Sequence, residues 1–278
     1  MPELPEVETL VKQLQPILQK NMITSAQFFR SDLREKIPIK KFPAYVLNKP
    51  IQQVSRRSKY LIIHTTSSRV LVHLGMSGAL LCYDLPTIKH DHTHAVFKIQ
   101  GKQQKIPVYL HYVDPRRFGL IDICTHDLLE QHPRIKHLGV EPLATKDLGS
   151  YLWQQSQSRS VAIKSFLMNA KIVVGVGNIY ACESLFKAGI HPKRLANRIS
   201  HERYLKLGKA IQNTLKKAIK AGGTTLNDYR NIEGKPGYFK VELAVYGRQD
   251  EPCYQCSTNI KSIKQTGRSS WFCSLCQT

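Results

Sequence analysis

The first residues of the chain combine groups that could carry covalent chemistry. Pro2 is small enough for the initiator methionine to be removed, which would leave a free secondary amine. A terminal amine has a pKa near ~7.7–8.0, so a useful fraction is neutral and nucleophilic at physiological pH, unlike an ordinary lysine near ~10.4. Attack of this amine on an aldehydic carbon would give a cationic iminium, and Glu3 could move a proton in that step.

The same residues also suit a structural role as the lead-in to a helix. Pro5 fits the first helical position, and Glu6 and Glu8 complement the positive end of the helix dipole. An apolar stripe at helical spacing follows, formed by Val7, Leu10, Val11, Leu14 and Leu18. The residues alone favour the helix role for Glu8 and leave both roles open for Pro2 and Glu3.

Four cysteines near the C-terminus have the spacing of a zinc site, Cys253-x2-Cys256-x16-Cys273-x2-Cys276. Each C-x2-C lets two thiolates from one turn reach the same ion, and the spacer fits a β-hairpin. Two disulfides are the alternative, which the absence of an export signal disfavours. We expect one structural Zn²⁺, and we expect the remaining thiols, Cys82, Cys124 and Cys182, to be buried and inert.

The charge balance predicts a polyanionic partner. The 278 residues include 41 Lys and Arg against 20 Asp and Glu, a formal net charge of +21. Basic side chains gain affinity for nucleic acid by displacing condensed counterions, so nucleic acid is favoured over an acidic membrane surface. With neither a secretory signal nor an apolar run of about 18 residues, we expect a soluble, cytoplasmic protein.

Hydrophobic patterning divides the chain into a strand-rich part and a helical part. Short β-rich runs lie between about residues 51 and 124, and 96–99 with 108–112 have the pattern of a hairpin. These strands predict a sandwich or barrel. Beyond a linker near 131–134, the pattern changes to helices at 161–170, at 178–186 with Asn178 as the cap, and from Ser200 to Gly222.

Three short motifs could contact DNA, although each also has an ordinary structural explanation. Gly175-Val176-Gly177 before a helix could present backbone N–H groups to a phosphate, or simply make a tight turn. Met76, between glycines, could wedge between bases or fill a gap in the core. Arg116, Arg117 and Phe118 on a probable turn suit phosphate contact and base stacking, or a solvated turn with Phe118 in the core.

Taken together, the motifs resemble those of the formamidopyrimidine-DNA glycosylase family, bacterial base-excision enzymes for oxidised purines. The resemblance spans essentially the whole chain, with Ser58 standing where the family usually has Gly or Ala. It is carried, in the family's order, by Pro2–Glu8, Arg56–Tyr60, His73–Gly78, Asp114–Gly119, Val173–Tyr180, Gly234–Phe239 and the four-cysteine tail.

The resemblance implies catalytic roles for four residues. Pro2 is implied to attack C1′ of the damaged nucleoside as a Schiff-base nucleophile, with Glu3 as proton donor. Lys59 is implied in β-elimination and Arg268 in δ-elimination. The implied DNA contacts are Met76, Arg116 and Phe118, which fill the gap left by the extruded nucleotide, together with His90, Arg159, Lys164 and Asn178. Glu183 matches a second family carboxylate near the pocket.

The implied fold is α+β and multidomain. It consists of an N-terminal two-sheet β-sandwich with a long helix over residues 1–132, a helix–two-turns–helix module over 133–236 and a zinc β-hairpin finger over 237–278. The implied partner is double-stranded DNA with oxidised purines or abasic sites, bound by a monomer with no membrane association.

Two other functions fit part of the pattern. Endonuclease VIII, a relative that prefers oxidised pyrimidines, usually begins Pro-Glu-Gly-Pro, whereas this chain has Leu4. A non-catalytic zinc-ribbon binder of DNA or RNA would explain the charge and the cysteines, but it gives no reason for the Pro2-Glu3 start or for Lys59 in its motif.

Overall fold

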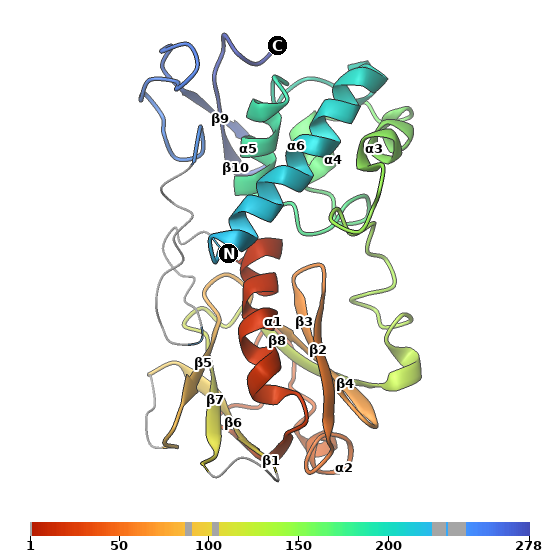
Figure 1. The fold of residues 1–278 in the computed structure, drawn as a ribbon, viewed down its shortest axis with the longest axis vertical. Helices are drawn as coiled ribbons and strands as arrows, with labels where there is room; N and C mark the ends of the chain where they lie inside the picture. The colour runs from red at the N-terminus through yellow and green to blue at the C-terminus, as the bar shows by residue number, and fades with distance from the viewer. Residues whose placement is uncertain (1, 87–90, 102–105, 224–231, 233–242) are drawn as a thin grey trace. The chain divides into compact units, whose positions relative to one another are not determined.

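The computed structural model describes residues 2–86, 91–101, 106–223, 232 and 243–278 (Figure 1). The chain divides into two compact units. The first consists of Met1–Lys136 with Gly222–Tyr238, and the second of His137–Ala221 with Phe239–Thr278.

The first unit is built on two antiparallel sheets of four strands each. One sheet has the order β1-β6-β7-β5, formed by β1 (Met22–Phe28), β5 (Ala79–Tyr83), β6 (Thr93–Gln100) and β7 (Val108–Val113). The other has the order β2-β3-β4-β8, formed by β2 (Ile51–Arg57), β3 (Tyr60–Thr65), β4 (Ser68–His73) and β8 (Leu120–Thr125). The predicted hairpin is the β6–β7 pair, whose turn lies outside the described residues.

One hydrophobic core joins both sheets and the first helix, α1 (Leu4–Leu18). The apolar stripe of α1 is buried along its whole length, as its spacing predicts. Phe97 and Leu110 from one sheet share this core with Ile63 and Val72 from the other. Because two separate sheets pack through their inner faces, the unit is a sandwich and not a barrel. Three short helices complete it: η1 (Ile39–Lys41), α2 (Phe42–Tyr45) and η2 (His126–Leu128).

The second unit is helical, with α3 (Leu148–Ser156), α4 (Ile163–Leu167), α5 (Asn178–Lys187), η3 (Ala196–Arg198) and α6 (His201–Lys220). The Ser200 hydroxyl caps α6 by accepting from the backbone N–H of Arg203 at 3.4 Å. Gly222, at φ +78°, follows the end of α6. The start and end of this helix therefore confirm the prediction, whereas α4 is shorter than the helix predicted over 161–170.

A two-stranded hairpin, β9 (Lys261–Gln265) and β10 (Arg268–Phe272), follows in the same unit. Its two-residue turn holds Thr266 at φ +47° and Gly267 at φ +76°, the left-handed pair of a type I′ turn. The 16-residue spacer between the cysteine pairs therefore forms the predicted hairpin. Within the described part of the chain, no helix is long and apolar enough to cross a membrane.

Candidate functional site

The N-terminal segment is built into the start of α1. Glu3 is the N-cap residue, and its backbone N–H donates to Glu6 Oε2 at 2.7 Å in a capping box. Pro5 is thus the second helical residue and not the first as predicted. Pro2 is buried, and Glu3 and Glu6 are 3% and 2% exposed. The helix therefore holds the residue at position 2 and the neighbouring carboxylate in fixed places.

Glu8 has a different partner from the one predicted. It is not part of the first turn of α1, and its carboxylate Oε2 accepts from Arg56 Nε at 3.0 Å. Another guanidinium nitrogen of Arg56, Nη1, donates to the Ser58 carbonyl at 2.9 Å. Arg56 therefore ties α1 to the β2–β3 turn formed by Ser58 and Lys59. Ser58 adopts φ +57°, a left-handed conformation that favours glycine.

The surroundings of Lys59 are electropositive. The pKa of His73, on the neighbouring strand β4, falls to about 4, mainly through burial and further through the charges of Lys59 and Arg34. His73 is therefore neutral at neutral pH, and its Nδ1 accepts from the Gly75 N–H at 2.9 Å. The two cations around His73 form a setting suited to a phosphate.

The structure brings the three predicted gap-filling residues onto two adjoining loops. Ser77 Oγ donates to Asp114 Oδ1 at 2.8 Å and accepts from the Arg116 N–H at 3.2 Å, so the loop of Met76 is joined to the loop of Arg116. The Arg116 guanidinium lies over the Phe118 ring, 4.9 Å from its centroid. Phe118 is 46% exposed, which excludes the alternative of a core role.

Gly75 allows this close packing. Its φ is +62°, and a Cβ there would lie 2.4 Å from the carbonyl carbon of Phe118. Asp114 also accepts from the Gly119 N–H at 2.8 Å through Oδ2 and is fully buried. Ser77 and Asp114 lie within the His73–Gly78 and Asp114–Gly119 motifs, but no role could be predicted for them from the sequence. The available signal was a hydroxyl and a carboxylate within two motifs whose other residues were predicted to contact DNA.

In the second unit, Lys164 and Asn178 meet at the finger hairpin. Lys164 is 1% exposed, and its ammonium donates to the Ser269 carbonyl at 2.8 Å and to Ser270 Oγ at 2.6 Å. Asn178 Nδ2 donates to the same carbonyl at 3.1 Å. The prediction that Asn178 caps α5 is wrong, because Gly177 is the N-cap and Asn178 is the first helical residue. Its side chain is directed to β10.

Arg268 is exposed at the first position of β10, next to the carbonyl held by Lys164 and Asn178. These three predicted residues therefore gather at one end of the hairpin. Arg159 is half-buried after α3, with Nε donating to the Gln155 carbonyl at 2.8 Å. His90 and the Gly234–Phe239 motif lie outside the described residues.

The four finger cysteines converge on one point. The sulfur atoms of Cys253, Cys256, Cys273 and Cys276 all lie within 4.8 Å of one another. Two hydrogen bonds from Thr258 lower the pKa of Cys256 to about 6, which favours its thiolate, whereas desolvation raises the pKa values of Cys273 and Cys276. The convergence of the four sulfur atoms, and not their titration, is therefore the argument for a metal site. Four converging thiolates fit a tetrahedral Zn²⁺ with no open position, so the ion they would hold stabilises the fold and does not activate water.

Glu183 is a structural carboxylate that the sequence could not assign. It is 1% exposed on α5 and accepts three backbone N–H groups, from Ala244 at 2.9 Å, Val245 at 3.0 Å and Tyr246 at 2.9 Å. Glu183 therefore fixes the segment that leads into the finger. Only a contact more than 60 residues away in sequence reveals this role.

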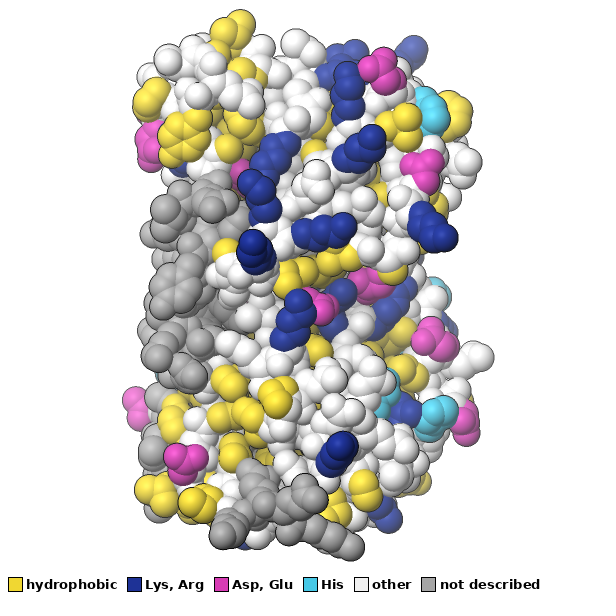
Figure 2. Space-filling view, in the orientation of Figure 1, with side chains coloured by type: hydrophobic (Ala, Val, Ile, Leu, Met, Phe, Trp, Pro, Cys, Tyr) yellow, Lys and Arg dark blue, Asp and Glu magenta, His cyan; other side chains and the backbone are white. Residues whose placement is uncertain are grey.

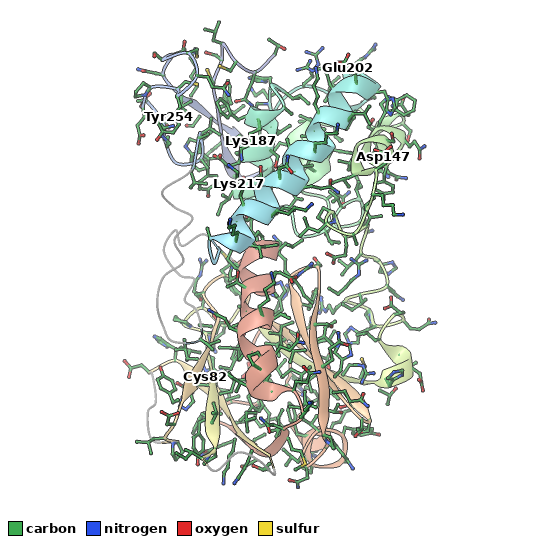
Figure 3. All side chains as sticks on the ribbon, viewed as in Figure 1. Cys82, Asp147, Lys187, Glu202, Lys217 and Tyr254 are labelled. Carbon is green, nitrogen blue, oxygen red and sulfur yellow. The ribbon has the colours of Figure 1, made fainter. Side chains whose placement is uncertain are left out.

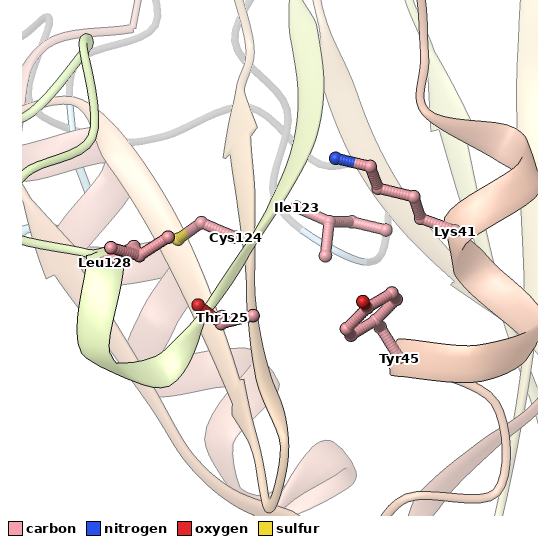
Figure 4. Close-up of a pocket in the computed structure, with 6 residues that line it drawn as sticks. All are labelled: Lys41, Tyr45, Ile123, Cys124, Thr125 and Leu128. Carbon is pink, nitrogen blue, oxygen red and sulfur yellow. The ribbon is translucent and has the colours of Figure 1, made fainter.

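The other three cysteines have no part in this site. Cys182 is buried beside the finger core, whereas Cys82 and Cys124 are half-buried. The prediction of burial is therefore confirmed for Cys182 and wrong for Cys82 and Cys124. Desolvation raises the pKa of Cys82 to about 12 and that of Cys124 to about 11, which favours the protonated thiols. Cys124 lines a cavity of about 170 Å³ with Lys41, Tyr45, Ile123, Thr125 and Leu128, and none of the predicted site residues lines it (Figure 4).

Comparison with known proteins identifies the family. The family model for the formamidopyrimidine-DNA glycosylase N-terminal domain matches residues 1–121, and the model for the H2TH domain of the same enzyme matches residues 138–230. The curated formamidopyrimidine-DNA glycosylase of Marinomonas sp. (strain MWYL1) is 45% identical over 280 residues, with 100% of both chains covered. That of Marinobacter nauticus is 45% identical over 279 residues with the same coverage.

Solved structures agree with this assignment. A complex of a mutant Lactococcus lactis FPG with Fapy-dG-containing DNA superposes with a TM-score of 0.90 at 30% identity over 99% of each chain. A complex of Lactococcus lactis Fpg with abasic-site DNA gives 0.89 at 31% identity, and one with oxidised-pyrimidine DNA gives 0.88 at 30%, each over 99% of both chains. The expected architecture of β-sandwich, H2TH domain and four-cysteine hairpin finger is confirmed. The chain therefore belongs to the formamidopyrimidine-DNA glycosylase family of DNA-repair enzymes.

Proposed function

We propose that this glycosylase excises oxidised purines from double-stranded DNA and then cuts the strand at the abasic site by β,δ-elimination. The observation that carries the proposal is the burial of Pro2 and Glu3 at the capped start of α1. A freely moving N-terminal tail could not aim an amine at one carbon atom, whereas a terminus continuous with a helix can.

In the proposed reaction, the Pro2 nitrogen attacks C1′ and the bond from C1′ to the damaged base breaks. Glu3 supplies a proton to the sugar ring oxygen, the ring opens, and the C1′–nitrogen link becomes an iminium. The iminium acidifies the C2′ proton, whose removal expels the 3′ phosphate in β-elimination. Lys59 assists this proton transfer, and Arg268 assists the second, δ-elimination. Water then releases Pro2.

The remaining residues are proposed to hold the DNA. Met76, Arg116 and Phe118 fill the space left by the extruded nucleotide, and their gathering on two joined loops supports this role. His90 and Arg159 contact the DNA backbone. Lys164 and Asn178 act at the same interface by holding the Ser269 carbonyl, and with it the hairpin, in place against the DNA. Cys253, Cys256, Cys273 and Cys276 hold one structural Zn²⁺, which orders the hairpin that presents Arg268. We further propose domains over 1–132, 133–236 and 237–278 acting as a monomer on DNA in the cytoplasm.

Cleavage of defined duplexes tests the proposal. One duplex carries 8-oxoguanine opposite cytosine and the other an oxidised pyrimidine. Both are compared because solved structures hold a mutant Lactococcus lactis FPG with Fapy-dG-containing DNA and the wild-type enzyme with oxidised-pyrimidine DNA. We expect faster cleavage of the first, with phosphates left on both sides of the gap. Preference for the pyrimidine would support the endonuclease VIII-like alternative. Intact strands would contradict the lyase step.

A further inference from the structure

Helix α6 exposes a row of positive charge on the side opposite its buried face. Tyr204, Leu207, Ile211, Leu215 and Ala218 are fully buried. Five exposed lysines, here called the α6 lysine face, are Lys206, Lys209, Lys216, Lys217 and Lys220. At about 100° per residue these lysines fall within about 100° of arc, centred nearly opposite the apolar stripe. Figure 2 shows the corresponding band of Lys and Arg where Figure 1 draws α6.

Carboxylates are scarce along this face. Glu202 is the only acid in α6 and lies at its beginning, 2.9 Å from Lys206. Asp147, the N-cap of α3, interacts with Lys209. Figure 3 shows Glu202 at one end of α6 and Lys217 toward the other, and the Lys187 ammonium of α5 donates to the Thr214 hydroxyl of α6 at 3.0 Å. The strongest positive charge therefore lies over the last two turns of α6.

Helix stability does not explain the row. Lysines in the last turn complement the helix dipole, which accounts for Lys217 and Lys220. It does not account for Lys206, Lys209 and Lys216. Like charges three or four residues apart, such as Lys216 with Lys220, cost a helix a few tenths of a kcal/mol each. The row of positive charges therefore lowers the stability of α6, and the needs of the helix itself do not explain it.

Within the second unit, the α6 lysine face lies on a different element from Lys164, Asn178 and Arg268, the residues proposed to act at the hairpin. Within the second unit, α5 contacts both β10 and α6. Lys164 and Asn178 point to β10, whereas the lysines of the α6 lysine face are exposed on the side of α6 opposite its buried stripe. A duplex held at the hairpin is therefore not the one that these lysines would contact.

We infer that the α6 lysine face binds the phosphate backbone of a second, undamaged DNA duplex. From Lys206 to Lys220 the helix rises about 21 Å, and that length of duplex axis presents roughly twelve phosphates. The apolar stripe of α6 is buried within the protein, so α6 has no exposed apolar face that could insert into a bilayer. The enzyme can then hold two DNA segments and pass between them without full dissociation. This inference goes beyond the proposed function, because the second duplex is not the substrate.

A bridging assay tests the inference. One labelled 15-base-pair duplex carries an uncleavable tetrahydrofuran abasic analogue, and a second labelled duplex is undamaged. The variant K209Q/K216Q/K217Q/K220Q is compared with the control K12Q/K36Q/K40Q/K41Q, which removes the same charge from exposed lysines of the first unit. Energy transfer between the duplexes reports bridging, and cleavage of a lesion duplex by the same preparations reports the proposed function separately.

We expect wild type and control to bridge the duplexes at low salt. The α6 variant should bind the undamaged duplex at least tenfold more weakly, with the slope of log K against log salt reduced by about 3 to 4, while its affinity for the abasic duplex changes less than twofold. Bridging by the α6 variant, equal loss in the control, or equal loss of abasic-duplex affinity would overturn the inference. So would α6-dependent binding of anionic vesicles or polyglutamate without any change in duplex binding.

Discussion

Arg56 and Glu8 form a largely buried ion pair, with 3.0 Å between Nε and Oε2, that joins strand β2 to helix α1. The Arg56 side chain is 8% exposed, and it also holds the carbonyl of Ser58. This pair connects the element that begins at the proposed nucleophile with the turn that carries Lys59. Arg56 therefore links the segments that carry Pro2 and Lys59, which have separate proposed roles in catalysis.

Replacing Arg56 by alanine should disturb both elements. We expect Arg56→Ala to lower the free energy of unfolding by about 1–3 kcal/mol, because a half-buried carboxylate and a carbonyl lose their donor and the buried Arg56 side chain leaves a gap. Strand cleavage at saturating DNA should fall more than DNA affinity. The matched control is Arg30→Ala, since the exposed Arg30–Asp32 pair should contribute less than about 1 kcal/mol. Equal losses of stability in the two variants would argue against the role of Arg56.

Removing one finger thiolate should remove the metal. We expect wild type to carry about one Zn²⁺ and Cys256→Ser to carry much less, with hydrogen exchange speeding up across residues 245–278. DNA binding and strand cleavage should fall together, because Arg268 depends on the hairpin. Cys82→Ser, which changes a thiol outside the cluster, serves as the control. Full metal content and full DNA affinity in Cys256→Ser would show that the zinc assignment is wrong.

The gap-filling loops should matter only when a base must leave the stack. Extrusion from a duplex costs a few kcal/mol, part of which the inserted side chains recover. We expect Met76→Ala, Arg116→Ala and Phe118→Ala to slow cleavage of lesion duplexes more than cleavage of abasic single strands. Phe29→Ala replaces an aromatic side chain of similar exposure in the same unit and should slow neither reaction. Equal loss on both substrates would instead indicate a structural role for these residues.

His73 should make stability depend on pH in the mildly acid range. Its pKa in the folded protein is about 4, against 6.5 for the exposed group, so the unfolded chain binds a proton more readily. The contribution of neutral His73 to the free energy of unfolding is nearly complete above pH 6.5 and is lost as the pH falls toward 4. About 1.5 kcal/mol of this free energy is lost between pH 6.5 and 5. Denaturant titrations of wild type and His73→Asn should show this difference in slope. Parallel curves for the two proteins would contradict the assignment.

Much of the fold was predictable because its signals are local. The apolar period of α1, the Ser200 cap of α6 and the spacing of the four cysteines each depend on residues close in sequence. The family resemblance located the site motifs for the same reason. The prediction of a helix cap at Asn178 was wrong because its side chain donates instead to the Ser269 carbonyl, 91 residues away in the chain.

The supporting contacts were not predictable, because they join distant segments. The role of Glu183 depends on its contact with the backbone amides of Ala244 to Tyr246, which are about 60 residues away in the sequence. Glu8 was predicted to interact with the helix dipole, because its true partner, Arg56, is 48 residues away and could not be recognised from the sequence. Ser77 and Asp114 belong to recognisable motifs, but only the pairing of β5 with β7 shows that they face each other. Sequence identifies residue types for chemistry, whereas tertiary contacts decide which residues hold them in place.

The most direct test of the central proposal is the identity of the residue that borohydride traps on abasic-site DNA. We expect a covalent adduct through Pro2 in protein that has lost Met1, because a terminal amine has a pKa near neutrality, whereas Lys59 would need a large downward shift of its pKa. Retaining Met1 should abolish trapping and leave DNA binding nearly unchanged. Peptide mapping of the adduct to Lys59, or undiminished trapping with Met1 in place, would contradict the mechanism.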